Sequence, residues 1–234
     1  MNTQEFSNQF DILYNNISSN MAPGLDEYDK SVFLTRSQEE LIMEYYSGDG
    51  KDGVSFEDTE EARRYLTSLV KSLKLTTPIT ITNDIQALSS NSKFFEIPDT
   101  VWYIIYEEAG LSDITGNKLP YGISSTADVI PISHDAFKKI KKNPFRMDNS
   151  NRVLKLSVSN TNKVLVELIN KYNIQYYLLR YIQQPTPIIL DTINGSSIYG
   201  ITAITQCTLH PSLHQTILER AVAMALKIYN ISSK

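Results

Sequence analysis

The C-terminal fifth of the sequence decides the fold: Pro185-Thr-Pro-Ile-Ile-Leu190, then Cys207-Thr-Leu-His-Pro-Ser-Leu-His214, then an apolar run to Tyr229. Apolar residues recur after His214 at helical spacing and predict a helix to about Tyr229. Pro211 marks the beginning of this helix, because a residue in the first turn needs no N–H. The two prolines of the first stretch cannot lie in a sheet interior, so that stretch is expected at an edge or in a crossing strand.

Two rows of apolar side chains run along the predicted helix. The first row is Leu213, Ile217, Ala221, Met224 and Ile228, and the second is Leu218, Val222, Ala225, Leu226 and Tyr229. Together they cover an arc of roughly 220°, whereas a helix lying on one core needs a stripe of about 100° or a little more. Two interpretations stay open: a helix buried within its own domain, and a helix shared between its own sheet and a neighbouring subunit.

Composition and charge exclude several classes of protein. The chain has 234 residues, 41% of them hydrophobic, which is enough for a substantial core. A formal net charge of −4 argues against a dedicated nucleic-acid binder. An intrachain disulfide is excluded because Cys207 is the one cysteine. The sequence lacks a signal peptide and a membrane-spanning run, so we expect a cytosolic or virion-borne protein.

The N-terminal third is predicted to be a helical layer. Periodic apolar residues indicate helices over 4–18, 25–34 and 56–75. The stretch Thr35-Arg-Ser-Gln38 has the form of a capping box, so a separate helix is predicted over 35–46.

Strands dominate the middle of the chain. Residues 78–82 alternate and residues 100–106 are β-branched and aromatic, whereas 109–130 should form a long excursion from the sheet. A short helix is predicted over 135–142. Strands are then predicted over 152–158, 163–169 and 174–182, and their hairpin-length connections suggest a meander.

The predicted fold class is α+β, with the helical N-terminal layer and the C-terminal helix packed on the antiparallel meander sheet. The segments are a helical layer (1–75), a mixed insertion (76–150), the meander (151–206) and the terminal helix (207–234). We expect them to form one intertwined domain.

Cys207, His210 and His214 are the one cluster of soft metal ligands. Their spacing could place three zinc ligands at a strand-to-helix junction, or a nucleophile beside a base. No fourth ligand is near in sequence, and a small thiol beside a helix N-terminus is common packing. We therefore assign no metal, no cofactor and no catalytic residue.

A basic cluster lies in the middle of the chain. Its cations are Lys138, Lys139, Lys141, Lys142 and Arg146. Three interpretations stay open: a solvated helix face, a salt bridge to an acidic patch of another subunit such as Glu57-Asp58-Thr-Glu60-Glu61, and contact with DNA.

Tyrosine content points to assembly. The chain has 14 tyrosines, and four gather around one predicted strand: Tyr172, Tyr176, Tyr177 and Tyr181. Tyrosine is favoured at interfaces, since its ring is apolar and its hydroxyl polar. Phosphate-binding loops and the common hydrolase and metalloprotease motifs are absent from the sequence.

Several stretches resemble virion structural proteins of crAss-like bacteriophages, which are podovirus-like phages of gut Bacteroidales. These stretches are Ala22-Pro-Gly-Leu-Asp-Glu-Tyr28, Lys30-Ser-Val-Phe-Leu-Thr35, Gln38-Glu-Glu40, Asn143-Pro-Phe-Arg146, and Cys207 through Glu219-Arg-Ala-Val222. The similarity extends from about residue 4 to residue 230. The members that the chain resembles look like neck or tail ring proteins stacked below the portal.

The resemblance implies a closed, twelve-fold ring through which the genome leaves the capsid. The implied partners are further copies of the chain, the portal protein, adjacent ring and tail proteins, and double-stranded DNA that passes without specific binding; no membrane is implied. The implied location is the neck or tail of the virion, after assembly in the host cytoplasm.

Our leading hypothesis is therefore a non-enzymatic ring or adaptor protein that forms a genome conduit and a platform for further tail proteins. The residues assigned to its interface are Leu218, Val222, Ala225, Tyr229, Tyr176, Tyr177, Lys138, Lys142 and Arg146. Two alternatives are kept: a metal-dependent enzyme that uses the Cys/His cluster, and a cytosolic DNA-binding module that uses the basic cluster.

Overall fold

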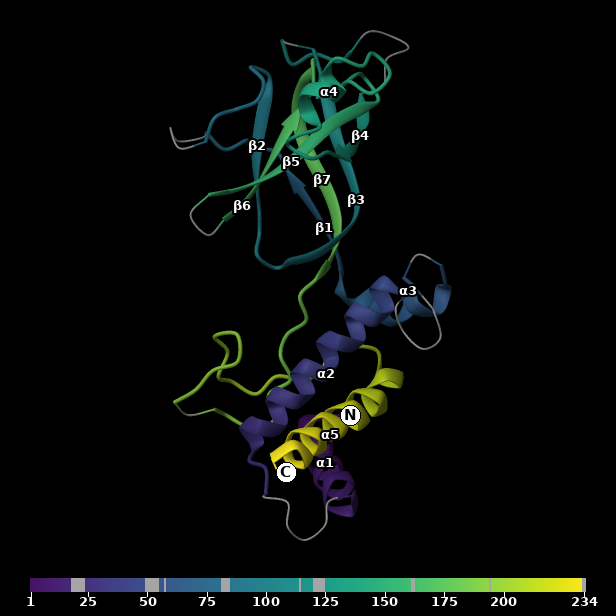
Figure 1. Cartoon of the computed structure of the whole chain (residues 1–234), viewed down its shortest axis with the longest axis vertical. Helices are drawn as coiled ribbons and strands as arrows, with labels where there is room; N and C mark the ends of the chain where they lie inside the picture. The colour runs from purple at the N-terminus through teal and green to yellow at the C-terminus, as the bar shows by residue number, and fades with distance from the viewer. Residues whose placement is uncertain are drawn as a thin grey trace. The chain divides into compact units, whose positions relative to one another are not determined.

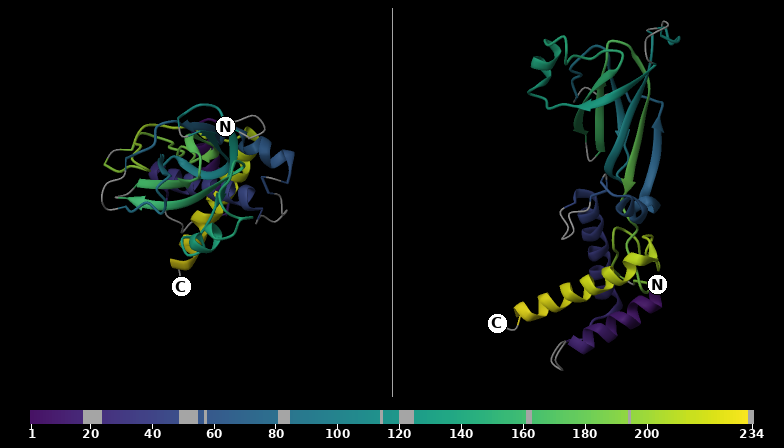
Figure 2. Two further views of the ribbon diagram at one scale, coloured as in Figure 1. Left: turned by 90° about the horizontal axis from the view of Figure 1, so that it is seen from above. Right: turned by 90° about the vertical axis from the view of Figure 1, so that its right-hand side faces the viewer.

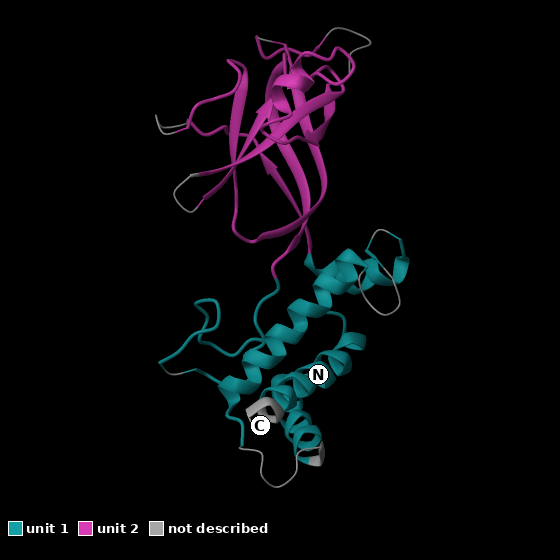
Figure 3. Cartoon of the chain, viewed as in Figure 1, with its two compact units in different colours: residues 1–69, 185–234 teal, residues 70–184 magenta. Residues whose placement is uncertain are grey.

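The computed structural model describes residues 1–17, 24–48, 55–56, 58–80, 85–113, 115–119, 125–160, 163–193 and 195–232. The chain forms two compact units, coloured separately in Figure 3. Unit 1 comprises residues 1–69 and 185–234, and unit 2 comprises residues 70–184. In sequence, unit 2 is inserted into unit 1. Residues 70–75, the last of the predicted helical layer, therefore belong to unit 2. Residues 185–206, the last of the predicted meander segment, belong to unit 1.

Unit 1 is built from helices. They are α1 (Thr3–Ile17), α2 (Glu27–Ser47), α3 (Glu60–Leu66) and α5 (His214–Ser232), with 3₁₀ turns η1 (Thr67–Leu69) and η2 (Pro211–Leu213). The helix α2 begins at the cap Asp26, whose carboxylate accepts the N–H of Asp29 at 2.7 Å. It ends at Gly48, where φ is 74°. No helix in the described part of the chain has the length and the apolar run that a bilayer crossing requires.

The helix α5 packs against both α1 and α2 of its own unit (Figures 1 and 2). The first three side chains of each row are buried, whereas Met224 is half-buried and Ile228 is exposed; the buried side chains are Leu213, Ile217, Ala221, Leu218, Val222 and Ala225. Fully burying such a large apolar side chain contributes on the order of 2 kcal/mol. Two helices of the same chain thus cover these six side chains, as in the interpretation of a helix buried within its own domain. The sequence also predicts that α5 packs on the sheet of 152–182; α5 belongs to unit 1 and that sheet to unit 2.

An extended segment, residues 186–190, lies along α2 and is held by polar side chains of the helix. The amide of Gln38 donates to the carbonyl of Thr186 at 2.9 Å. The hydroxyl of Ser31 accepts the N–H of Leu190 at 3.0 Å, and Thr35 bonds to Ile188 between them. Residues 31, 35 and 38 share a helix face, and 186, 188 and 190 are alternate residues of an extended chain. Side chains of α2 therefore make the hydrogen bonds to the backbone of this segment that a neighbouring strand would make in a sheet.

Thr35 corrects one prediction. The capping-box pattern predicts a new helix at this residue, but α2 continues through it without a break. Thr35 and Gln38 are buried and bond to the segment 186–188, about 150 positions later in the sequence. Their polar character serves a tertiary contact instead of a helix end.

Unit 2 is a curled sheet of seven strands in the order β1-β7-β3-β4-β5-β6-β2 (Figure 1). The strands are β1 (Val70–Leu75), β2 (Ser92–Ile97), β3 (Val101–Ser112), β4 (Thr126–Pro131), β5 (Arg152–Asn160), β6 (Lys163–Ile169) and β7 (Asn173–Gln183). The pairing is antiparallel except between β4 and β5. Side chains from all seven strands contribute to one core, which contains Phe95, Val153 and Tyr177. The predicted α+β class is confirmed.

The outer face of β5 is covered by a short helix. This helix, α4 (Phe137–Lys141), places Phe137 against Leu154 and Leu156, whereas Val153, the residue before Leu154, belongs to the common core on the other face. The helix predicted over 135–142 is therefore confirmed, with shorter bounds.

The strands after residue 150 follow the predicted ranges, but they do not form a complete meander. β5 and β6 form a hairpin, whereas β7 pairs with β1 and β3 instead of β6. The turn between β6 and β7 is fixed by Asn170, whose amide donates to the carbonyls of Asn149 and Arg152 at 2.8 and 2.7 Å. Its side-chain oxygen accepts the N–H of Tyr172 at 2.9 Å. The chain thereby crosses the core instead of turning back beside β6.

Three further predictions change. The helix predicted over 56–75 is wrong in its last part, because residues 70–75 form strand β1. In the predicted strand 78–82, Ile79 makes a single bridge to Phe94, and residues 81 and 82 lie outside the described residues. The predicted excursion 109–130 is shorter, since β3 continues to Ser112 and β4 begins at Thr126; residues 114 and 120–124 between them are not described.

Candidate interaction surfaces

Cys207, His210 and His214 each have a separate structural partner. The thiol of Cys207 donates to the side-chain oxygen of Gln38 at 3.2 Å, and burial raises its pKa to about 11. The imidazole of His210 accepts the N–H of Ser212 at 3.3 Å and caps the turn η2. A thiol with a raised pKa is a poor nucleophile and a poor metal ligand.

His214 lies at the beginning of α5 and is buried. Its Nε2 is 3.2 Å from the carbonyl oxygen of Leu209, and burial lowers its pKa. Within the described residues, no three His, Cys, Asp or Glu side chains are placed to share a metal ion. The predicted cluster therefore fixes the start of the helix.

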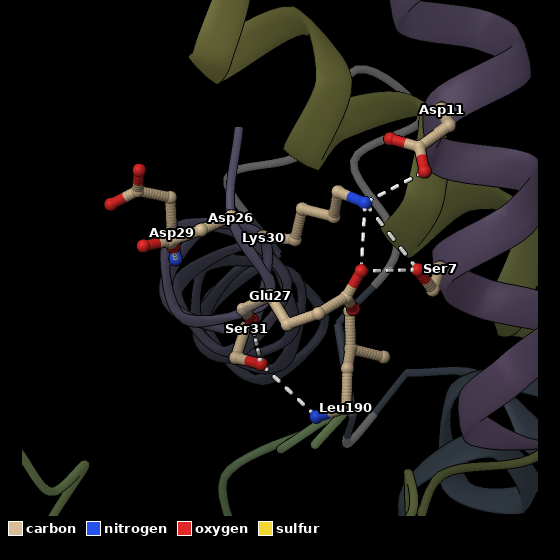
Figure 4. Close-up of polar contacts among 8 residues, drawn as sticks. All are labelled: Ser7, Asp11, Asp26, Glu27, Asp29, Lys30, Ser31 and Leu190. Carbon is tan, nitrogen blue, oxygen red and sulfur yellow. Dashed lines mark hydrogen bonds and ion pairs between the residues drawn. The ribbon is translucent and has the colours of Figure 1, made fainter. Parts of the chain in front are cut away.

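Lys30 is a buried cation in unit 1, with 3% of its surface exposed. Its ammonium group contacts Asp11 of α1 at 2.7 Å and Glu27 of α2 at 2.9 Å (Figure 4). Burial alone would lower the pKa of Lys30, but the hydrogen bonds and charges of these carboxylates outweigh it and raise the pKa. The cluster ties α1 to α2.

The interior of unit 2 also contains a charged group. Glu107 of β3 accepts hydrogen bonds from Lys155 of β5 and from the hydroxyl of Tyr177 of β7. Burial and the charge of Glu107 raise the pKa of Tyr177. These contacts link three strands across the core, so the polar groups inside the sheet serve its structure.

A groove of about 370 Å³ lies on α2 in unit 1. We call it the α2 groove and define it by the lining residues Tyr28, Val32, Arg36, Glu39, Ile198 and Tyr199. One wall is α2. The other wall is a hairpin loop of residues 187–205, which is closed by bridges between Ile189 and Thr205 and between Ile198 and Ile201.

Tyr199 stands at the tip of this hairpin loop with 59% of its surface exposed. Its φ is 52°, the one positive value of a non-glycine residue in the described part of the chain, and Gly200 follows with 77°. The left-handed conformation costs a bulky residue roughly 1–2 kcal/mol, and glycine or asparagine would normally occupy such a turn. A tyrosine held at this position indicates a role for its side chain beyond the turn.

Glu39 lies in the wall of the α2 groove. Burial and a hydrogen bond to Glu39 raise the pKa of Tyr199 to about 12. The Oε1 oxygen of the same carboxylate is buried and has no hydrogen-bond partner among the described residues. A buried carboxylate oxygen without a donor is unfavourable, so the groove is suited to receive a cation or another donor.

The basic cluster surrounds an exposed aromatic residue in unit 2. Phe145 is 86% exposed, the largest exposed fraction of any large hydrophobic side chain among the described residues. Its N–H donates to the side chain of Asn143 at 3.0 Å, and its carbonyl accepts from Arg152 at 2.8 Å. The turn is therefore ordered, and it holds the ring in solvent. We call this surface the basic turn and define it by Lys138, Lys139, Lys141, Lys142, Phe145 and Arg146.

The residues that the sequence assigns to an interface fall into three groups. Lys138, Lys142 and Arg146 are exposed on the basic turn. Leu218, Val222, Ala225 and Tyr177 are buried within their own units. Tyr176 is half-buried, with its hydroxyl 3.1 Å from Glu108, and the side chain of Tyr229 is not among those described.

Two surface residues were missed by the sequence reasoning. Phe145 lies inside a quoted family stretch, but nothing in its sequence neighbourhood shows that it is exposed. Tyr199 precedes Gly200 between two isoleucines, which is a recognisable turn pattern. That pattern could have placed the tyrosine at a loop tip.

These features define a protein whose polar interior groups support its fold and whose exposed aromatic residues offer contacts to partners. The family model described as "Phage tail ring protein 3/4" matches residues 1–234. The chain is 45% identical over 228 residues to "Ring protein 3" of Bacteroides phage crAss001, covering 97% of this chain and 95% of the relative. It is 33% identical over 239 residues to "Ring protein 4/5" of the same phage, covering 98% and 94%.

The chain therefore belongs to the phage tail ring protein 3/4 family. It is a structural ring protein of a bacteriophage and a component of the virion. The resemblance to crAss-like phage ring proteins is confirmed over the whole chain.

Proposed function

We propose that identical copies of this chain form a closed ring in the neck or tail barrel beneath the portal. The observation that carries the proposal is that the chain matches two ring proteins of one phage over nearly their full lengths. Twelve copies would match a twelve-fold portal. The non-enzymatic assignment rests on the family and on the structural partners of Cys207, His214 and Glu107.

The proposed ring is a conduit for the genome and a platform for further tail proteins, and it assembles in the host cytoplasm. The higher identity to Ring protein 3 than to Ring protein 4/5 favours the corresponding position in the stack. A formal net charge of −4 suits a lumen past which DNA slides, because each phosphate that a protein neutralises adds salt-dependent affinity.

Native mass spectrometry and electron microscopy of the full chain test the proposal, with the chain expressed alone and together with the portal protein of its phage. We expect a closed ring of twelve copies in at least one of these preparations. A chain that stays monomeric in both would contradict the proposal, whereas another copy number would refute the twelve-fold symmetry alone.

A DNA-binding module is the alternative that involves the basic turn. Fluorescence anisotropy with a short duplex at several salt concentrations separates the two functions. We expect weak binding with little salt dependence. Tight binding that falls steeply with salt, and that is lost when Lys138 and Lys142 are changed to glutamine, would favour the DNA-binding function.

A further inference from the structure

The basic turn and the α2 groove lie on different units, and each has charged groups without an ion-pair partner among the described residues. None of the five cations of the basic turn forms a salt bridge with another described residue. Phe145 has almost its whole ring in solvent. In the groove, Tyr28 and Val32 are exposed and Oε1 of Glu39 lacks a donor. The basic turn therefore offers cations and an exposed aromatic ring, and the α2 groove offers a carboxylate and exposed apolar side chains.

The charges of the two surfaces are complementary. The helix α2 carries five carboxylates, Glu27, Asp29, Glu39, Glu40 and Glu44, against two cations, Lys30 and Arg36. Glu27 pairs with Lys30, Glu40 with Arg36 and Glu44 with Arg220, so Asp29 and Glu39 are the carboxylates of the helix without an ion pair among the described residues. The basic turn holds five cations on and beside α4, and the carboxylates next to it in sequence are Asp135 and Asp148, on either side of residues 136–147. Opposite potentials of this kind favour docking and fix its orientation.

We propose that the basic turn of one copy docks into the α2 groove of the neighbouring copy in the ring. Phe145 packs on Tyr28, Val32 and Tyr199, and the guanidinium of Arg146 pairs with the carboxylate of Glu39. An exposed aromatic residue beside an arginine is the type of pair that carries most of the binding energy at interfaces. The inference rests on the proposed function, because it names the contact by which the ring closes.

The contact is heterologous, since it joins two different surfaces of the same chain. Heterologous contacts produce closed rings when their rotation closes, whereas a self-complementary contact would stop at a dimer. The strained conformation of Tyr199 also has an explanation here, because a smaller residue would not present an aromatic wall to Phe145.

Charge exchange tests the contact in the full chain, under the conditions in which the wild type forms rings. We expect Arg146→Glu and Glu39→Arg each to lower the assembled fraction at least tenfold, and the combination of both to restore most of it. Lys118→Glu, which makes the same charge change at an exposed position outside both surfaces, should assemble like the wild type. Circular dichroism and thermal unfolding of each variant show whether the monomer is folded.

A mixing experiment tests the head-to-tail geometry. Phe145→Asp removes the basic turn's contact, and Val32→Asp removes the groove's contact; both residues are exposed, so both variants should fold. Each variant alone should stay monomeric. An equimolar mixture should give heterodimers without rings, because one intact turn meets one intact groove and the second contact is broken.

The outcomes separate this inference from the proposed function. If the wild type forms rings and the charge-exchanged and aspartate variants form them equally well, the contact is refuted and the ring remains. If Arg146→Glu lowers DNA affinity and leaves ring formation unchanged, the basic turn binds nucleic acid and the contact is likewise refuted. If the wild type never forms rings, both proposals fail. Monomeric single variants with restoration in the double variant support the contact.

Discussion

The hydroxyl of Thr35 makes two hydrogen bonds to one residue: it donates to the carbonyl of Ile188 at 3.3 Å and accepts the N–H of Ile188 at 3.0 Å. Both residues are buried. Thr35→Val keeps the shape of the side chain and leaves two buried backbone groups without a partner. We expect a loss of about 2–4 kcal/mol in the free energy of unfolding, measured by urea denaturation. Thr202→Val, at an exposed position of the same unit, should change it by less than about 0.5 kcal/mol. Equal effects of the two variants would contradict the role of Thr35.

Lys30 should make the stability of the protein sensitive to alkaline pH. Its pKa is raised in the folded state, so its contribution is fully present at neutral pH and is lost as the pH rises through the raised value, above 10.5. Lys30→Met should lower the free energy of unfolding at pH 7 by about 2 kcal/mol, since Asp11 and Glu27 lose their partner but remain partly solvated. Denaturation from pH 7 to 11 measures both effects. Lys227→Met, on the exposed side of α5, should have almost no effect; a Lys30→Met variant as stable as the wild type would refute the argument.

Cys207 should be almost inert in the folded protein. Burial raises the pKa of its thiol from 9.0 to about 11, which lowers the thiolate fraction at pH 8 by about 100-fold. We expect labelling with a disulfide reagent at pH 8 to be slower by at least this factor in the native chain than in urea. Rapid native labelling, or stoichiometric zinc in the purified protein, would instead restore the metal and nucleophile interpretations of the Cys/His cluster.

Tyr199 should lower the stability of the chain and favour its assembly into rings. Tyr199→Asn places a residue that tolerates positive φ at the hairpin tip, so the free energy of unfolding should rise by about 1 kcal/mol while the assembled fraction falls. Gly200→Ala should have the opposite effect on stability at the neighbouring position, because nothing lies within 4 Å of the added methyl group and the backbone strain acts alone. Thermal unfolding and native mass spectrometry measure the two quantities. Unchanged ring formation by Tyr199→Asn would exclude this tyrosine from the contact.

The sequence predicted those parts of the fold in which the local spacing of apolar residues agrees with the tertiary contacts that the residues make. The rows around Leu218 and Ile217 predicted α5 correctly, and alternation predicted the ranges of β5, β6 and β7 closely. The capping-box pattern at Thr35 failed because a partner 153 positions away uses its hydroxyl. Likewise, residues 70–75 continued a helical spacing but became a strand because β7 pairs with them.

The candidate surfaces were only partly readable from the sequence. The basic cluster around Arg146 could be identified from the sequence, because its five cations lie within nine residues of one another. The exposure of Phe145 depends on the turn that Asn143 and Arg152 hold, and the orphan oxygen of Glu39 depends on a hairpin loop from the other end of the chain. Conversely, the apolar rows of α5 left a subunit interface open as one of two interpretations, because the pattern could not show that α1 and α2 pack against the helix.

The insertion of unit 2 into unit 1 has a consequence for synthesis on the ribosome. Residues 70–184 are contiguous and can fold as soon as they emerge, whereas α1 and α2 must wait for residues 186–190 and for α5, the last helix to be made. The wall of the α2 groove that carries Tyr199 also arrives late. A nascent chain thus exposes a finished basic turn before it has a groove to receive one, so incomplete chains on neighbouring ribosomes cannot polymerise through this pair of surfaces.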